Sequence, residues 1–150
     1  MLSELLTEEN IRFLPAAADW HEAVRLCAEP LLESGAITAR YAEAMVQSVE
    51  LHGPYIVVDE GLALPHARPE DGAVRPGMAM LILERPVDLL GQSVWVFVAL
   101  AAADANAHLD ALKELAELVW NGGTARVLAS LGTPVSVTAY IKEHTVQNES

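Results

Sequence analysis

The sequence predicts an α/β fold, a three-layer α/β/α sandwich around a mixed β-sheet, on two observations. Helix-period apolar patterns occupy both ends of the chain, and a series of apolar, strand-like segments lies between them. The last two of these segments, residues 78–83 and 94–101, are apolar throughout, as in strands that helices cover on both faces. Helices that precede and follow such strands pack as two layers with the sheet between them.

Local signals then place each element in order. Residues 11–14 are expected to form a short edge strand. Asp19 and Thr38 are predicted N-caps, and the two helices that they begin are expected to end at Gly35 and Gly53. Further strands are expected at residues 55–58, 62–64, 78–83 and 94–101. Three helices complete the prediction, at about residues 106–122, 124–132 and 134–144.

Length and composition indicate one domain that spans residues 1–150. Apolar residues make up 52% of the chain, but no apolar run is long enough to cross a bilayer, and the N-terminus lacks the features of a signal peptide. A cytoplasmic protein is therefore expected. The single cysteine, Cys27, excludes an internal disulfide and a cysteine-rich metal cluster, and its apolar helical surroundings predict a core residue.

The net charge of −12, from 9 basic and 21 acidic residues, argues against nucleic acid and anionic membranes as partners. An anionic group bound by this chain would experience an unfavourable overall field. Local positive groups must therefore offset that field wherever an anion binds.

The segment Gly-Leu-Ala-Leu-Pro-His-Ala-Arg-Pro at residues 61–69 is the most informative part of the chain. It places His66 between Pro65 and Pro69, with Arg68 two residues further on. Proline fixes its own φ and biases the preceding residue toward extended geometry, so the backbone that carries His66 is constrained. A constrained imidazole beside a guanidinium suits a nucleophile that accepts an anionic group.

His108 is the second candidate, because it lies in the first turn of a predicted helix directly after the strand at 94–101. Free N–H groups at such a helix start favour an anion, and the imidazole could donate a further hydrogen bond. The alternative is an exposed polar residue on a first helical turn. Because His66 and His108 both follow strands, they could meet at one edge of the sheet.

The other ionisable residues carry less weight. His52 is expected at a helix end, and His21 and His144 on helix surfaces; the histidine spacing predicts no metal site. Four acids flank His66 in the sequence, and one of them could orient its imidazole; otherwise they are solvated turn residues. They are Asp59, Glu60, Glu70 and Asp71.

Residues 61–70 resemble the phosphorylation-site signature of enzyme IIA domains of the bacterial phosphoenolpyruvate-dependent sugar phosphotransferase system, in the mannitol–fructose class. Residues 53–58 and 102–108 look like the ascorbate-type branch of that class, and the resemblance runs over nearly the whole chain. It implies a mannitol-type IIA-like fold. One departure is the absence of an arginine near Val49 and Glu50, where many mannitol–fructose-type domains carry one.

The resemblance also implies a phosphotransferase mechanism. His66 would accept a phosphoryl group from the phosphohistidine of the carrier protein HPr and pass it to a cysteine of an enzyme IIB partner. The IIB partner would in turn serve a membrane IIC component during sugar uptake. His108 would stabilise the phosphoryl group, Arg68 could supply charge, and the chemistry needs no metal, nucleotide or other cofactor. Ascorbate or a related sugar acid or pentitol is the substrate that the branch suggests.

Two other functions fit the same residues. A regulatory IIA-like module would use its phosphorylation state to control a transporter, kinase or transcription factor. A binding domain that keeps only the fold would never carry phosphate. The oligomeric state is left open, and Trp95 together with the apolar composition is compatible with a homodimer.

Overall fold

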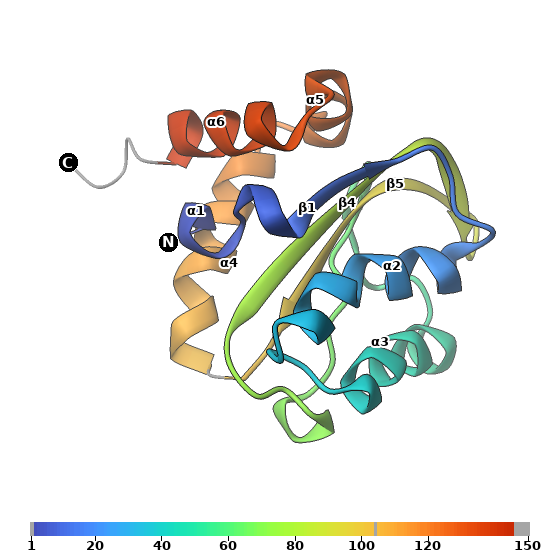
Figure 1. Ribbon diagram of the computed structural model, residues 1–150. Helices are drawn as coiled ribbons and strands as arrows, with labels where there is room; N and C mark the ends of the chain where they lie inside the picture. The colour runs from blue at the N-terminus through green and yellow to red at the C-terminus, as the bar shows by residue number, and fades with distance from the viewer. Residues whose placement is uncertain (1, 104, 146–150) are drawn as a thin grey trace.

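A computed structural model of the chain describes residues 2–103 and 105–145, with only the backbone described for 105–108 (Figure 1). A mixed five-stranded sheet lies at its centre, in the order β1-β4-β5-β3-β2. β4 pairs antiparallel with β5 and β3 with β2, whereas β1–β4 and β3–β5 are parallel pairs. The strands are β1 (Ile11–Leu14), β2 (Val57–Asp59), β3 (Gly61–Ala63), β4 (Gly77–Leu89) and β5 (Gln92–Ala101).

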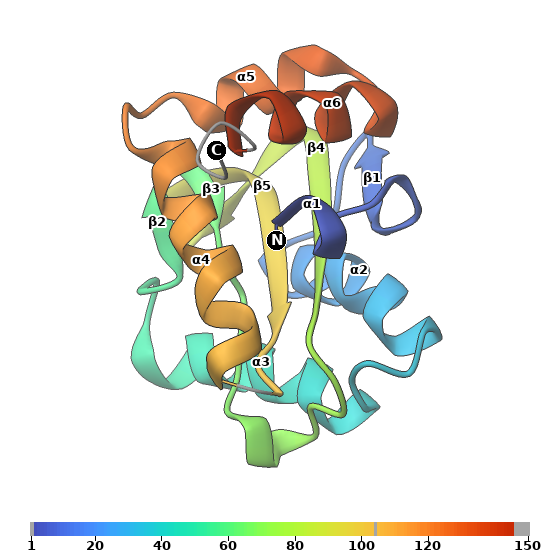
Figure 2. The same cartoon turned by 90° about the vertical axis from the view of Figure 1, so that its left-hand side faces the viewer.

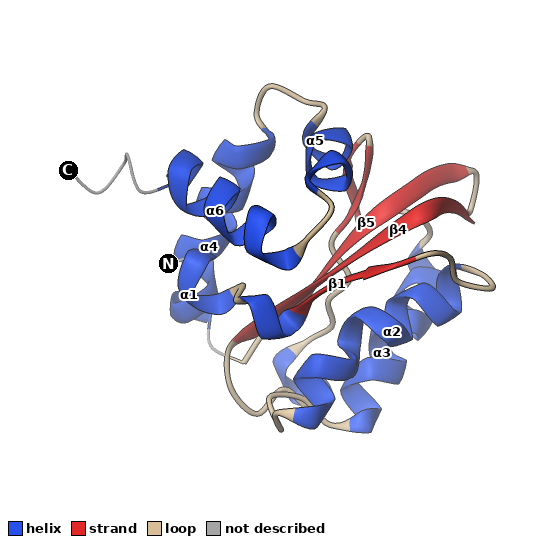
Figure 3. Ribbon diagram, turned by 45° about the horizontal axis from the view of Figure 1, so that its top comes forward, coloured by secondary structure: helices blue, strands red, loops and turns tan. Residues whose placement is uncertain are grey.

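Helices cover both faces of the sheet, which confirms the predicted three layers (Figures 1 and 3). Helices α2 (Trp20–Glu33) and α3 (Ala39–His52) cover one face. The other face carries α1 (Leu2–Leu5), α4 (Ala105–Val119), α5 (Thr124–Leu131) and α6 (Pro134–Thr145). Short 3-10 turns lie at Glu8–Asn10 and Pro69–Asp71.

Each face of the sheet has its own hydrophobic core, which explains why the central strands are apolar throughout. Side chains alternate between the two faces along a strand. In β4, Ala79, Leu81 and Leu83 therefore pack toward α2 and α3. Met78, Met80 and Ile82 pack toward the helices of the opposite face.

The predicted N-caps of α2 and α3 are confirmed. The Asp19 carboxylate accepts a hydrogen bond from the Glu22 backbone N–H at 2.9 Å, and the Thr38 hydroxyl accepts one from Tyr41 at 3.3 Å. α3 ends at His52, and the next residue, Gly53, caps it with a φ of +85°, in the region that favours glycine.

The structure corrects several of the predicted elements. β4 continues to Leu89 rather than stopping at residue 83, because its second half pairs with the start of β5 in a hairpin. Tyr55 lies in the turn before β2 rather than in a strand. The N-terminal helix α1 was not predicted; it forms where Leu2 and Leu6 are buried in the second core.

The pairing of β3 with β5 determines where the site lies. These strands are parallel neighbours, so their carboxyl ends lie at the same edge of the sheet. The segment that carries His66 continues from β3, and α4 follows β5. Figure 2 shows both segments at the lower edge of the sheet, next to α3.

Candidate functional site

His66 lies on an extended segment directly after β3, and its imidazole is half-buried. Its Nδ1 lies 2.8 Å from the backbone oxygen of Leu64. A carbonyl oxygen can only accept a hydrogen bond, so in the neutral imidazole Nδ1 carries the proton and Nε2 keeps a free lone pair. The Leu64 N–H donates to Ile56 O at 2.8 Å, and Pro65 O accepts from the Leu100 N–H at 2.9 Å. The imidazole is therefore oriented by a carbonyl that is itself held in place.

The Tyr41 hydroxyl of α3 holds the other side of this segment. It accepts hydrogen bonds from the backbone N–H groups of Ala67 at 3.1 Å and Ala102 at 3.0 Å, and donates to Leu100 O at 2.8 Å. Burial raises the pKa of Tyr41, which keeps the hydroxyl protonated and able to donate. One buried hydroxyl thus joins the residue after His66 to the end of β5.

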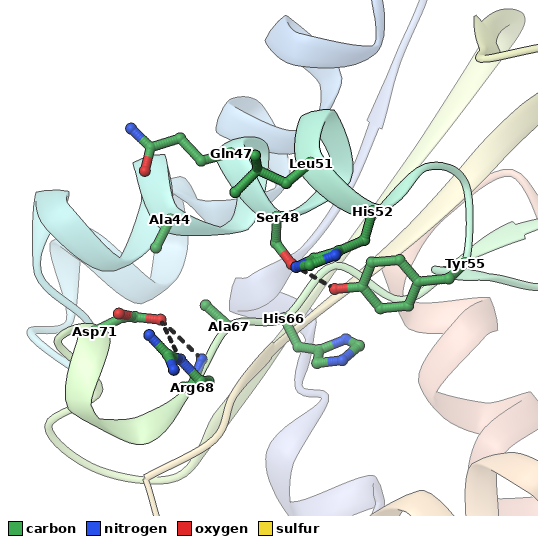
Figure 4. Close-up of a pocket in the computed structure, with 10 residues that line it drawn as sticks. All are labelled: Ala44, Gln47, Ser48, Leu51, His52, Tyr55, His66, Ala67, Arg68 and Asp71. Carbon is green, nitrogen blue, oxygen red and sulfur yellow. Dashed lines mark hydrogen bonds and ion pairs between the residues drawn. The ribbon is translucent and has the colours of Figure 1, made fainter.

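An open cavity of about 650 Å³ lies between α3 and this segment (Figure 4). On its helix side, the hydroxyl groups of Ser48 and Tyr55 are 2.6 Å apart. The Tyr55 ring lies edge-on to the His66 imidazole, with ring centroids 5.7 Å apart and an angle of 83°. The lining residues are Ala44, Gln47, Ser48, Leu51, His52, Tyr55, His66, Ala67, Arg68 and Asp71.

Arg68 lines the same cavity, but its guanidinium is paired with carboxylates. Its side chain is 76% exposed, and its Nε lies 3.5 Å from Glu70 and 3.7 Å from Asp71. Asp71 also accepts the Arg68 backbone N–H at 3.1 Å. The positive charge is therefore partly neutralised before any anion enters.

The flanking acids do not orient His66 in this structure, since the Leu64 carbonyl does so. Glu70 and Asp71 pair with Arg68, and Glu60 pairs with Arg126 on α5. One carboxylate oxygen of Asp59 is buried without a hydrogen-bond partner among the described atoms.

His108 belongs to the first turns of α4, and the backbone of that helix begins at the same edge of the sheet as the His66 segment (Figure 2). Its side chain lies outside the described part of the structure. On α3, Val49 is buried in the core, and Glu50 lies 3.9 Å from His21. No arginine is among the α3 residues that line the cavity, so the departure seen in the sequence holds at the site.

Sequence reasoning missed Tyr41, Ser48, His52 and Tyr55 as residues of this site. A usable signal existed for the helix, because Ala44, Ser48 and His52 recur every four residues and so share one face. Tyr41 lies on the buried face of the same helix, and nothing local indicates that its hydroxyl contacts the His66 segment. The strand predicted at residues 55–58 includes Tyr55, whereas the structure places this residue in a turn beside His66.

Fold and site together define a class of protein: a phosphotransferase component, with the His66 imidazole held after the end of a parallel strand. Residues 4–144 match the family described as "Phosphoenolpyruvate-dependent sugar phosphotransferase system, EIIA 2". The chain belongs to this family. The family and the fold expected from the sequence are thereby confirmed.

Curated relatives carry two sugar specificities. The chain is 37% identical to the mannitol-specific cryptic phosphotransferase enzyme IIA component of Escherichia coli, over 79% of this chain and 82% of the relative. It is 36% identical to the ascorbate-specific EIIA component of Shigella boydii, over 69% of this chain and 70% of the relative.

Solved structures agree with the fold. The mannitol-specific cryptic enzyme IIA of Escherichia coli is 32% identical, with a TM-score of 0.86 over 95% of this chain and 98% of that one. The mannitol enzyme IIA from the same species, solved in complex with phosphorylated enzyme IIB, is 22% identical. It matches with a TM-score of 0.78 over 92% and 97% of the two chains, and shows the fold alone. In the described residues, no helix combines the length and apolar character needed to span a bilayer.

Proposed function

We propose that His66 is the phosphoryl acceptor of this chain and that its Nε2 is the nucleophile. The observation that carries this proposal is the hydrogen bond from Nδ1 to Leu64 O, which leaves the Nε2 lone pair free. The ring lines an open cavity that a protein donor can approach. A neutral imidazole nitrogen held in one orientation is suited to phosphoryl transfer, which depends mainly on positioning and charge stabilisation.

The proposed step exchanges one nitrogen–phosphorus bond for another. The Nε2 lone pair attacks the phosphorus of phospho-HPr, a new N–P bond forms, and the N–P bond of the donor histidine breaks. The donor nitrogen recovers its electron pair, and Nδ1 of His66 keeps its proton and its hydrogen bond to Leu64 O. In the second step, a cysteine thiolate of the IIB partner attacks phosphorus and an S–P bond forms. The N–P bond to Nε2 breaks, its electron pair returns to Nε2, and His66 is neutral again.

His108 is proposed to stabilise the phosphoryl group from the α4 side of the site. The position of α4 supports this role, because the helix starts at the edge of the sheet where the His66 segment ends. Arg68 is proposed as a weaker contributor of charge, since Glu70 and Asp71 already contact its guanidinium.

At the level of the cell, we propose that residues 1–150 act as one cytoplasmic IIA domain in a sugar phosphotransferase system. HPr is the donor, enzyme IIB the acceptor, and a membrane IIC component the partner of IIB. Similarity to the ascorbate-specific EIIA component supports ascorbate, or a related sugar acid or pentitol, as the transported substrate.

The test is intact mass after incubation with phosphoenolpyruvate, enzyme I and HPr. Wild-type protein should gain one acid-labile phosphoryl group, and His66→Ala should gain none while it keeps a native circular dichroism spectrum. The matched control is His144→Ala on the exposed end of α6, which should be labelled like wild type. Stoichiometric labelling of His66→Ala would overturn the assignment.

The proposed nitrogen has its own test. In the phosphorylated protein, phosphorus–nitrogen couplings measured by NMR should place phosphorus on Nε2, because Nδ1 is occupied by its hydrogen bond to Leu64. Phosphorus on Nδ1 would contradict the tautomer that the structure indicates.

A further inference from the structure

The cavity that contains His66 is also lined by a second histidine, which comes from α3. His52 is the last residue of α3 and is exposed at the rim of this cavity. The Tyr55 ring lies beside both imidazoles, with centroids 6.2 Å from His52 and 5.7 Å from His66. Figure 4 shows both imidazoles next to the Tyr55 ring, on the wall of the cavity.

His52 differs from Arg68 and from His21 of α2 because no carboxylate of the described residues forms an ion pair with it. Arg68 contacts Glu70 and Asp71, and His21 lies near Asp19 and Glu50. The Tyr55 ring lies edge-on to the His52 imidazole. The His52 imidazole is therefore available to an incoming anion, and at the exposed rim it can change rotamer rapidly.

The position of His52 also meets an electrostatic need. The C-terminal end of a helix carries partial negative charge, and α3 directs this end toward the rim of the cavity. The chain as a whole carries a net charge of −12. A phosphoryl group on His66 would thus meet negative potential on the α3 side unless a cation from that helix lies beside it.

We propose that His52, in its protonated form, binds the phosphoryl group of phospho-His66 from the α3 side of the cavity. The imidazolium donates a charge-assisted hydrogen bond to a phosphoryl oxygen. This inference rests on the proposed function, because it requires a phosphoryl group on His66. It adds a phosphoryl-binding residue from α3 to the proposed contributions of His108 and Arg68.

The proposal makes the phosphorylated state depend on pH. Histidine changes charge between about pH 5 and pH 8, so the contact is present at the acidic end of this range and lost at the basic end. The other titratable and charged groups that line the cavity are Tyr55, His66, Arg68 and Asp71. Because these groups remain unchanged in a His52 variant, the difference between variant and wild type isolates His52.

The experiment measures the equilibrium between phospho-HPr and this protein by phosphorus NMR, at about pH 6 and about pH 8.5. His52→Gln should lower the equilibrium constant about fivefold at the acidic pH and leave it unchanged at the basic pH. His52→Lys, which keeps a positive charge at both pH values, should hold the constant at or above the acidic wild-type level throughout. His144→Gln is the control, a distant helix histidine that should behave as wild type.

A second readout reports on His52 directly. The titration midpoint of its ring protons should move up by about one pH unit when His66 becomes phosphorylated, because a nearby anion favours the imidazolium. His144 should show no such change. If wild-type protein is phosphorylated and His52→Gln has the same equilibrium constant at both pH values, this inference is overturned and the proposed function is not. Wild-type protein that accepts no phosphoryl group would overturn the proposed function and this inference with it.

Discussion

At the scale of single residues, the site depends on hydrogen bonds that hold backbone rather than on a network of charged side chains. The Leu64 carbonyl selects the His66 tautomer, and the Tyr41 hydroxyl holds the backbone on the other side of the imidazole. Tyr41 is fully buried, and a buried backbone N–H without an acceptor costs free energy, so its hydroxyl stabilises this arrangement. Its hydroxyl is therefore a positioning group for the proposed nucleophile, His66.

Removing that hydroxyl tests its role. Tyr41→Phe keeps the ring but leaves the N–H groups of Ala67 and Ala102 without their acceptor, and should lower the free energy of unfolding by about 2 kcal/mol. Urea denaturation checks this value. The control is Tyr140→Phe, since the Tyr140 hydroxyl makes no hydrogen bond with any described residue. Equal stability of Tyr41→Phe and wild type would show that the hydroxyl does not hold this segment.

At the scale of elements, the edge formed by β3 and β5 depends on a close approach at Gly61. The φ of this residue is +78°, and a Cβ atom built there would lie 2.3 Å from the Trp95 ring. Trp95 is fixed in turn, because its indole N–H donates to Ala125 O at 3.0 Å. Trp95 is thus engaged within the chain, and the expectation of a homodimer gains no support from it.

Gly61→Ala should therefore be more costly than an alanine at another left-handed glycine. Gly91 is the matched control, with a φ of +97° and no atom within 4 Å of the added Cβ. Both variants carry backbone strain, but only Gly61→Ala adds a steric clash, which should cost about 2 kcal/mol more. Thermal and urea unfolding of the two variants would measure the difference. Equal losses would mean that Trp95 moves aside without cost.

At the scale of the whole molecule, each face of the sheet has its own core, and the core between the sheet and helices α2 and α3 buries the cysteine completely. Cys27 is 1% exposed in the core beneath α2 and α3. Its thiol lies 3.4 Å from Ala79 O and 3.3 Å from Phe97 O. Burial raises the pKa of Cys27 to about 12, so the thiolate is scarce at neutral pH.

Cys27 should for this reason report global unfolding. Native protein at about pH 8 should resist alkylation by iodoacetamide, because only the thiolate reacts and the thiol is inaccessible. Protein unfolded in urea should be modified at the rate of a free thiol. Mass spectrometry over a urea series should give a labelling transition that coincides with the circular dichroism transition. Rapid labelling of the folded protein would contradict the burial of this residue.

The sequence by itself determined the features that have local causes. Helix caps at Asp19 and Thr38 act within one turn, and unbroken apolar runs report strands covered on both faces, so the layers were predictable. The residues around His66 were recognisable because two prolines restrict the local backbone whatever the rest of the chain does.

Only the tertiary structure decided which distant residues meet. The parallel pairing of β3 with β5 brings the His66 segment and α4 to one edge, and no local signal encodes strand order. The same applies to Tyr41, whose partners lie 26 and 61 positions away, and to His52 and Tyr55 beside His66. Such contacts depend on how two layers pack across a sheet, and packing is a property of the folded chain rather than of any segment of it.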